Sequence, residues 1–300
     1  MTWTLAQTGK QDGRVAIVTG ANIGLGLNTA LELAGKGFRV VLACRNLDKA
    51  AEAKADILRQ QPKAKAKIEC LQLDLCSLQS VRAFADRYTA KHKRLDLLIN
   101  NAGIMMPAFA LSEDGFESQL AANYLGHFAL TGRLLPLLEK TTDSRVVSLS
   151  SLAHNWSNMR FDDLHFSQGY NKRKAYGQSK FACLMFAYEL NRRLQKASSK
   201  TISVAAHPGV SATNLGQHFP RVLSALFPLF GQSAADGALP TLYAALGDDI
   251  QGGDYCGPKA MQQMRGAPVK VGSNRASKDE AAAKKLWTVS EKLTGVKFLS

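Results

Sequence analysis

The 300-residue chain lacks the features that mark disulfide-rich, zinc-binding and membrane-spanning proteins. Its five cysteines are odd in number and include no CxxC pair, so neither a disulfide framework nor a metal site is expected. No apolar run reaches the length of a membrane-spanning helix, and residues 1–13 contain no apolar stretch of signal-peptide length. We therefore expect a cytoplasmic protein with reduced thiols.

The sequence also has no linker and no internal repeat. No segment rich in proline, glycine or serine divides it, and with 46% hydrophobic and 21% charged residues it has enough apolar side chains for a core. Because open α/β sheets often reach this length in one unit, residues 1–300 are predicted to form a single domain.

Positive charge is in excess, with 38 Lys and Arg residues against 24 Asp and Glu residues and a formal net charge of +14. Such a balance can indicate nucleic acid or an anionic membrane surface as a partner. The basic residues are scattered, however, and no basic helix is interleaved with aromatic residues. We interpret the charge as a solvated surface together with an anionic cofactor, and expect no nucleic-acid partner.

Strand and helix patterns alternate along the chain. This alternation predicts an α/β fold of the Rossmann type, a doubly wound parallel sheet with helices on both faces. Ligands then bind at the carboxyl ends of the strands. Apolar runs predict strands at 14–18, 38–43, 68–73, 95–99, 145–149 and 202–206, and helical patterns end at 36 and cover 47–61, 77–91, 115–139, 176–195 and 278–293.

A glycine-rich turn joins the first predicted strand to the first helix. Its glycines, Gly20, Gly24 and Gly26, are spaced Gly-xxx-Gly-x-Gly. Glycines let the backbone approach a pyrophosphate, and the N-terminus of the following helix faces that anion. This turn predicts a dinucleotide site.

The end of the second strand indicates which dinucleotide is bound. An acidic residue there would bind the adenosine ribose of NAD, but this chain has Cys44 followed by Arg45. A charge-assisted hydrogen bond from Arg45 to a 2′-phosphate contributes about 1.5–3 kcal/mol, roughly a ten- to hundredfold preference. We predict NADP(H); the alternative is that Arg45 is merely a solvated residue at a helix entry.

Three further segments follow predicted strands. Asp74 and Leu75 can hold the adenine amino group and cover its ring, although Asp74 also lies where the next helix is capped. The small-residue turn Asn101-Ala102-Gly103 follows the fourth strand, and residues 208–213 after the sixth can bind the nicotinamide end of the cofactor.

Tyr176 and Lys180 lie four residues apart at the start of a predicted helix and so project from one face of it. An ammonium about 6 Å from a phenol favours the phenolate by roughly 3 kcal/mol at an effective dielectric constant of about 20. Such a phenol can give or take a proton in a carbonyl/alcohol interconversion. The same spacing also occurs by chance, so the pair is informative only together with the other segments.

Several residues near this pair have open roles. Ser151 is delivered to the same sheet edge by the fifth strand, and Asn123 either ties a helix to a strand or holds a water near Lys180. The aromatic loop 154–170 is expected to form a substrate-facing wall. The apolar segment 219–230 is predicted to belong to a substrate lid around 214–232, with a peripheral membrane contact as the alternative.

Taken in order, these motifs resemble the short-chain dehydrogenase/reductase family over essentially the whole chain. The match consists of the glycine turn, Asn101-Ala102-Gly103, Ser151, Tyr176 with Lys180, and Pro208-Gly209. The run 150–154, the Cys44-Arg45 strand end, residues 207–210 and Leu286-Trp287 resemble the retinol dehydrogenase-like branch.

The resemblance implies roles for individual residues. Tyr176 is expected to be the general acid for reduction or base for oxidation, and Lys180 to assist it and bind the nicotinamide ribose. Ser151 is expected to bind the reacting oxygen and Asn123 to position a proton-relay water. The cofactor contacts implied are Gly20, Asn22, Ile23, Gly24 and Gly26 at the phosphates, Arg45 at the 2′-phosphate, Asp74 and Leu75 at the adenine, Asn101, Ala102 and Gly103 near the ribose, and Pro208, Gly209, Val210 and Thr213 at the nicotinamide.

The function expected from these residues is that of an NADP(H)-dependent oxidoreductase acting on an apolar ketone, aldehyde or alcohol that is retinoid-like, steroid-like or xenobiotic. The alternative is a non-catalytic NADP(H)-binding sensor or scaffold protein. Members of the family are commonly homodimers or homotetramers, and the sequence leaves this choice open.

Overall fold

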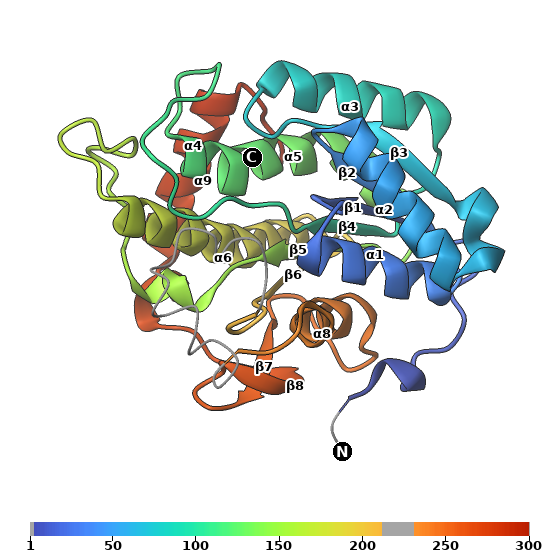
Figure 1. Cartoon of the computed structure of the whole chain (residues 1–300). Coiled ribbons are helices and arrows are strands. Elements are labelled where there is room, and N and C mark those ends of the chain that lie inside the picture. The colour runs from blue at the N-terminus through green and yellow to red at the C-terminus, as the bar shows by residue number, and fades with distance from the viewer. Residues whose placement is uncertain (1–2, 212–230, 300) are drawn as a thin grey trace.

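A central sheet of eight strands organises the computed structural model, which describes residues 3–211 and 231–299 apart from the side chains of residues 65 and 66 (Figure 1). The strand order is β3-β2-β1-β4-β5-β6-β7-β8. All neighbouring strands are parallel except β7 and β8, which form an antiparallel hairpin. The strands are β1 (Val15–Thr19), β2 (Arg39–Cys44), β3 (Ile68–Gln72), β4 (Leu97–Asn100), β5 (Arg145–Leu149), β6 (Ile202–Ala206), β7 (Tyr255–Ala260) and β8 (Arg265–Lys270).

Helices cover both faces of the sheet and enclose two large apolar cores and a third, smaller one, which confirms the expected doubly wound fold. Strand β1 is buried at every position, as expected for a parallel strand covered on both faces. One face carries α1 (Gly24–Gly35), α2 (Leu47–Gln60) and α8 (Ala234–Leu246), and the other carries α3 (Leu78–Lys91), α4 (Ser118–Leu120), α5 (Gly126–Glu139), α6 (Lys172–Lys196) and α9 (Glu280–Thr294).

Side-chain caps fix where several helices begin. The side chain of Asn46 accepts from Lys49 N at the start of α2, and that of Asn171 accepts from two backbone N–H groups at the start of α6. Asp279 caps α9 in the same way. These caps satisfy N–H groups that have no partner inside the helix.

The helix expected at 115–139 is wrong in its first part. The Glu117 side chain accepts from Gln119 N and Leu120 N, so α4 begins only at Ser118. A π-helical turn, Ala121–Leu125, then separates α4 from α5. Asn123 lies in this turn, and such turns are frequent at functional sites.

Helix α8 and the β7–β8 hairpin were not expected from the sequence. Pro240 lies inside α8, and Pro258 and Pro268 lie inside the two strands, where proline normally argues against a regular element. In Figure 1 the hairpin and α8 lie together at the bottom of the molecule, where β7 and β8 extend the sheet beyond β6. The sheet is therefore larger than the sequence indicated.

Helix α9 closes the face formed by α5 and α6. Trp287 is 1% exposed and packs against the rings of Phe128, Phe186 and Phe298. The guanidinium of Arg193 lies over the Trp287 ring at 4.4 Å. This part of the α5–α6 surface is thereby covered by the chain itself.

Within residues 3–211 and 231–299, no helix combines the length and the hydrophobicity that crossing a bilayer requires.

Candidate active site

The carboxyl ends of the parallel strands bring most of the expected site residues to one edge of the sheet. The glycine turn follows β1, the Asn101 turn follows β4, Ser151 follows β5, and Pro208 follows β6. These four strands are neighbours in the order β1-β4-β5-β6. Segments more than 180 residues apart in sequence, such as Gly20 and Pro208, are thus placed along one edge.

The glycine turn is packed against the Asn101 turn. Gly20 and Gly24 have φ angles of 65° and 57°, in the left-handed region that favours glycine. A Cβ atom on Gly26 would lie 2.4 Å from Gly20 O and 2.6 Å from Asn101 Nδ2. These glycines are therefore required by the backbone conformation and by the approach of a second loop.

Thr19 joins the two turns. Its Oγ1 accepts from Asn101 N and Ala102 N, each at 2.9 Å, and Asn101 Nδ2 donates to Thr19 O at 2.7 Å. Within the described residues, helix α1 begins without a side-chain cap, so its first N–H groups face the glycine turn. Asn22 and Ile23 lie at this helix entry, and Ile23 is 48% exposed. This arrangement suits an anionic phosphate.

The residues expected at the adenine end lie at the ends of β2 and β3. Arg45 is exposed, whereas Cys44 is 2% exposed, and burial raises the pKa of its thiol to about 11. Asp74 Oδ1 accepts from Cys76 N at 2.9 Å, while the α3 cap is Ser77. Leu75 is only 8% exposed, and its side chain packs in the core.

Tyr176 and Lys180 lie side by side in the first turns of α6, 5% and 6% exposed. Lys180 Nζ is 6.0 Å from the centroid of the Tyr176 ring and donates to Leu149 O at 3.1 Å. A Cβ atom on Gly103 would lie 3.3 Å from Lys180 Nζ. The turn after β4, the end of β5 and α6 therefore meet at the ammonium group.

Ser151 is fixed relative to α6 by the short helix η4 (Leu152–Asn155). Its Oγ accepts from Ala153 N at 3.2 Å, and the hydroxyl hydrogen has no acceptor among residues 3–211 and 231–299. A Cβ atom on Gly177 would lie 3.1 Å from Ala153 O, so η4 packs directly on the helix beside Tyr176. The ring of Trp156 lies 6.1 Å from that of Tyr176.

The Asn123 side chain is fully engaged. Its Oδ1 accepts from Ile104 N at 2.8 Å, and its Nδ2 donates to Ile104 O at 3.0 Å and to Ser179 Oγ at 2.8 Å. It therefore ties the loop after β4 to α6.

Sequence reasoning missed His127. Its Nδ1 lies 2.9 Å from Asn123 O, and its Nε2 lies 2.9 Å from Thr19 Oγ1. Burial lowers the pKa of His127 to about 4, and the nearby Lys180 charge adds to this effect. The neutral ring thus donates from Nδ1 and accepts from the Thr19 hydroxyl at Nε2. Its position four residues after Asn123, on the same helical face, was the available signal.

The apolar loop after Gly103 was also missed. Phe109 and Leu111 are 48% and 54% exposed, and the Phe109 ring lies 5.2 Å from that of Tyr170. The expected aromatic wall, loop 154–170, therefore meets a second apolar segment at Tyr170. Thr213 and the lid expected around 214–232 lie outside the described residues, except for Gly231 and Gln232.

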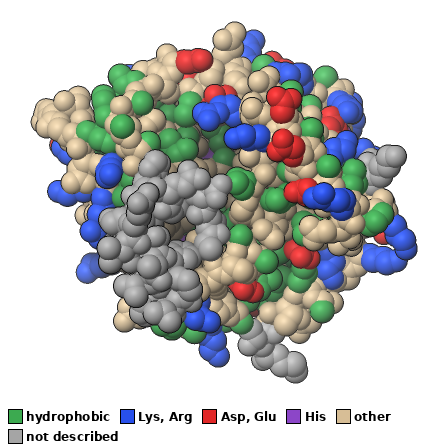
Figure 2. All heavy atoms as spheres, viewed as in Figure 1, with side chains coloured by type: hydrophobic (Ala, Val, Ile, Leu, Met, Phe, Trp, Pro, Cys, Tyr) green, Lys and Arg blue, Asp and Glu red, His purple; other side chains and the backbone are tan. Residues whose placement is uncertain are grey.

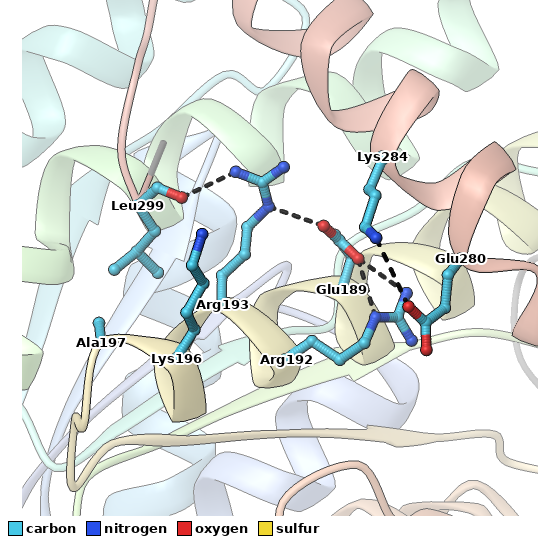
Figure 3. A pocket seen from close by; sticks show the side chains of 8 residues that line it. All are labelled: Glu189, Arg192, Arg193, Lys196, Ala197, Glu280, Lys284 and Leu299. Atoms are coloured by element: carbon cyan, nitrogen blue, oxygen red, sulfur yellow. Dashed lines mark hydrogen bonds and ion pairs between the residues drawn. The ribbon is translucent and has the colours of Figure 1, made fainter.

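On the face shown in Figure 2, basic side chains are interspersed with acidic and hydrophobic ones. A separate depression of about 620 Å³ lies between the end of α6 and α9 (Figure 3). There Arg192 and Arg193 both point to Glu189, and Lys284 pairs with Glu280. Its lining contains none of the candidate site residues.

Comparison with known proteins shows the family. A family model described as short chain dehydrogenase matches residues 14–221. Human retinol dehydrogenase 13 is 40% identical over 296 residues, which cover 95% of this chain and 85% of that protein. A crystal structure of an uncharacterised protein from Mycobacterium paratuberculosis is 41% identical and covers 99% of both chains with a TM-score of 0.83.

A short chain dehydrogenase from Shigella flexneri, solved in complex with NADP, is 25% identical, with a TM-score of 0.66 over 83% of this chain and 98% of that one. The expected resemblance, including the retinol dehydrogenase-like branch, is confirmed. The chain belongs to the short-chain dehydrogenase/reductase family and is an oxidoreductase of the kind that acts on CH–OH or C=O groups.

Proposed function

We propose that the protein is an NADP(H)-dependent oxidoreductase that interconverts an apolar ketone or aldehyde and the corresponding alcohol. The observation that carries this proposal is the placement of Lys180 Nζ 6.0 Å from the centroid of the Tyr176 ring. Ser151 lies just after the end of β5, the strand whose Leu149 O contacts Lys180. A binding or scaffold protein has no need of such a group of proton donors.

The residues present fit a nicotinamide dinucleotide. The glycine turn, residues 20–26, forms the proposed phosphate cradle, and a Cβ atom on Gly26 would fill the space in it. The first turn of α1 presents N–H groups to a phosphate there. Gly20, Asn22, Ile23 and Gly24 would line the same cradle. When bound, the cofactor supplies or accepts the hydride.

The preference for NADP(H) rests on the end of β2. Arg45 is exposed there, and the neutral, buried Cys44 thiol carries no charge that would repel a 2′-phosphate. Asp74 would accept from the adenine amino group. The structure of the Shigella flexneri relative contains NADP, which supports the same preference.

The chain's own residues would handle the proton. Tyr176 would donate its phenolic proton to the carbonyl oxygen in reduction, or accept the alcohol proton in oxidation. The free hydroxyl hydrogen of Ser151 would hydrogen-bond that oxygen. Among the described residues Lys180 Nζ donates only to Leu149 O, so two N–H groups would serve the nicotinamide ribose and a relay water beside the loop that Asn123 holds.

The apolar walls favour an apolar substrate. Trp156 lies beside Tyr176, and Phe109 and Leu111 are exposed at the rim. The relative retinol dehydrogenase 13 is named after retinol, an apolar alcohol. We also propose a cytoplasmic location, either free or peripheral to a membrane.

The test is Tyr176→Phe in an NADPH-consumption assay with retinal, steroids, quinones and small aldehydes. Loss of the proton donor should lower kcat by about two to four orders of magnitude. The affinity for NADPH, measured by fluorescence titration, should stay within about threefold.

Tyr188→Phe is the matched control because Tyr188 lies on the same helix and its hydroxyl contacts only Ser273 among the described residues. It should retain wild-type turnover. Near-wild-type turnover in Tyr176→Phe would refute the proposed role, and tight NADPH binding by the wild type without oxidation of any substrate would favour the sensor or scaffold alternative.

A further inference from the structure

The backbone that follows β6 is held by residues far away in the sequence. His207 is fully buried, and its main-chain N donates to Cys256 O of β7 at 2.9 Å. Pro208, Gly209 and Val210 come next, and these are the residues proposed to contact the nicotinamide. Their position therefore depends on what fixes His207 and the backbone after it.

The hydrogen bonds of His207 define its tautomer. Gly209 N donates to His207 Nδ1 at 3.2 Å, so Nδ1 carries no hydrogen. Nε2 then carries the hydrogen and donates to Gln263 Oε1 at 2.9 Å. Burial lowers the pKa of His207 to about 4, in agreement with a neutral ring. A Cβ atom on Gly257 would lie 2.0 Å from Nε2, so glycine there makes room for the ring.

Gln263 belongs to a strained turn between β7 and β8. Met261, Gln262 and Gln263 have φ angles of 49°, 54° and 66°, three consecutive non-glycine residues in the left-handed region. Such residues cost about 1–3 kcal/mol each and persist only where their surroundings hold them. Here the turn is held by contacts with His207 and with the backbone of the segment after β6.

The same turn contacts the backbone of that segment directly. Val210 N donates to Met264 O at 2.8 Å, and a Cβ atom on Gly209, whose φ is 65°, would lie 2.3 Å from Met264 O. The turn therefore sets where Gly209 and Val210 lie, by a hydrogen bond and by close packing.

A second group of contacts joins the segment to the start of β8. Gln232 N donates to Val210 O at 2.9 Å, and Gln232 Nε2 donates to Pro208 O at 2.8 Å. Gln232 Oε1 accepts from Gly266 N at 3.0 Å. The segment is thus held at both sides by the β7–β8 hairpin.

We propose that Gln263 is a positioning residue for the nicotinamide half of the cofactor, acting through His207 on the backbone of residues 208–210. The inference rests on the proposed function, since it assumes that this segment meets the nicotinamide. Without the Gln263 acceptor, the His207 N–H loses its partner, and the turn that packs on Gly209 loses one of its holding contacts. The adenine half lies at the ends of β2 and β3 and should not respond.

The experiment compares Gln263→Ala with Gln262→Ala. Gln262 is the adjacent residue, has the same side chain and a similar φ, and is exposed, so alanine imposes the same backbone cost at both positions. Fluorescence titration measures the Kd for NADPH and for 2′,5′-ADP, which lacks the nicotinamide. Gln263→Ala should weaken NADPH about three- to tenfold, as expected for one hydrogen bond, and leave 2′,5′-ADP unchanged. Gln262→Ala should leave both within twofold.

Gln263→Asn is a second variant. Asparagine tolerates the left-handed region, but its side chain is one methylene shorter, so its amide oxygen no longer reaches His207 Nε2. It should also weaken the binding of NADPH while leaving the Kd for 2′,5′-ADP unchanged. Equal behaviour of the Gln262 and Gln263 variants, or equal weakening of NADPH and 2′,5′-ADP, would overturn this inference alone. Failure of the wild type to bind NADPH more tightly than 2′,5′-ADP would overturn the assumed nicotinamide contact, and the inference with it.

Discussion

Arg45 and Cys44 present contrasting chemistry at the end of β2. The guanidinium is exposed, and the thiol beside it is buried and uncharged because burial raises its pKa to about 11. A 2′-phosphate placed here would find a positive charge and no negative one from the strand end. Two adjacent residues therefore carry the proposed cofactor preference.

Arg45→Ala should lower the preference for NADPH over NADH, measured as the ratio of their kcat/KM values, by roughly ten- to a hundredfold. The loss should come from weaker NADPH use, because NADH has no 2′-phosphate. Arg59→Ala, on the exposed face of α2, removes the same charge and should not change the ratio. An unchanged ratio in Arg45→Ala would exclude it as the 2′-phosphate ligand.

At the scale of elements, α1 and the turn before it have to accommodate the loop after β4. Gly26 lies in the first turn of this helix, and Gly35 is its last residue. Glycine inside a helix normally lowers stability by about 1 kcal/mol relative to alanine. Helix propensity alone would therefore favour alanine at both positions. The surroundings of the two glycines differ.

Gly26→Ala should weaken NADPH binding at least tenfold and destabilise the protein by about 1–3 kcal/mol, because its Cβ would lie 2.4 Å from Gly20 O, a backbone atom. Gly35→Ala is the control. There the nearest atom is Gln61 Nε2 at 2.9 Å, the end of a flexible side chain, so binding should be unchanged. Fluorescence titration and denaturant unfolding measure both effects; wild-type affinity in Gly26→Ala would contradict the assigned phosphate cradle.

At the scale of the whole molecule, buried histidines connect elements that are far apart in the sequence. His127 joins α5 to the end of β1, and His207 joins the end of β6 to the β7–β8 hairpin. Burial lowers the pKa of both to about 4, and lowers the pKa of His92, His154 and His165 as well. All five histidines in the described part of the chain are thus held toward the neutral form.

The protein should lose stability between pH 7.5 and pH 5. In the unfolded chain histidine titrates near 6.5, so between about 4 and 6.5 the unfolded state binds more protons than the folded state, and lowering the pH favours unfolding. His127 and His207 should each contribute a loss of about 2 kcal/mol at pH 5. Urea unfolding at the two pH values measures this.

Carboxylates affect stability mainly at lower pH. The pKa of Glu69 is lowered by its Lys91 and His92 partners against the opposing effect of burial, so its stabilising contribution is lost only as the pH falls through its folded-state value. Equal free energies of unfolding at pH 7.5 and pH 5 would show that the folded and unfolded states take up the same number of protons, and so would contradict the lowered histidine pKa values.

Much of the framework could be predicted because its signals are local. Strands β1 to β6 follow apolar runs, and the four-residue spacing of Tyr176 and Lys180 on a helix places Lys180 Nζ 6.0 Å from the centroid of the Tyr176 ring. The start of the 115–139 helix was misjudged because the Glu117 cap and the π-helical turn are not visible in a periodic apolar pattern. The β7–β8 hairpin was missed because its prolines and glycines obscure the strand signal.

The sequence by itself determined the strand–turn–helix order, the glycine turn and the Tyr176–Lys180 pair, since each depends on residues that are close along the chain. Only the tertiary structure decided that Asn123 binds Ile104 and Ser179, that His127 reaches Thr19, and that Gln263 reaches His207. These contacts join residues on different elements, and their side chains meet only because the parallel strands bring those elements to one edge of the sheet.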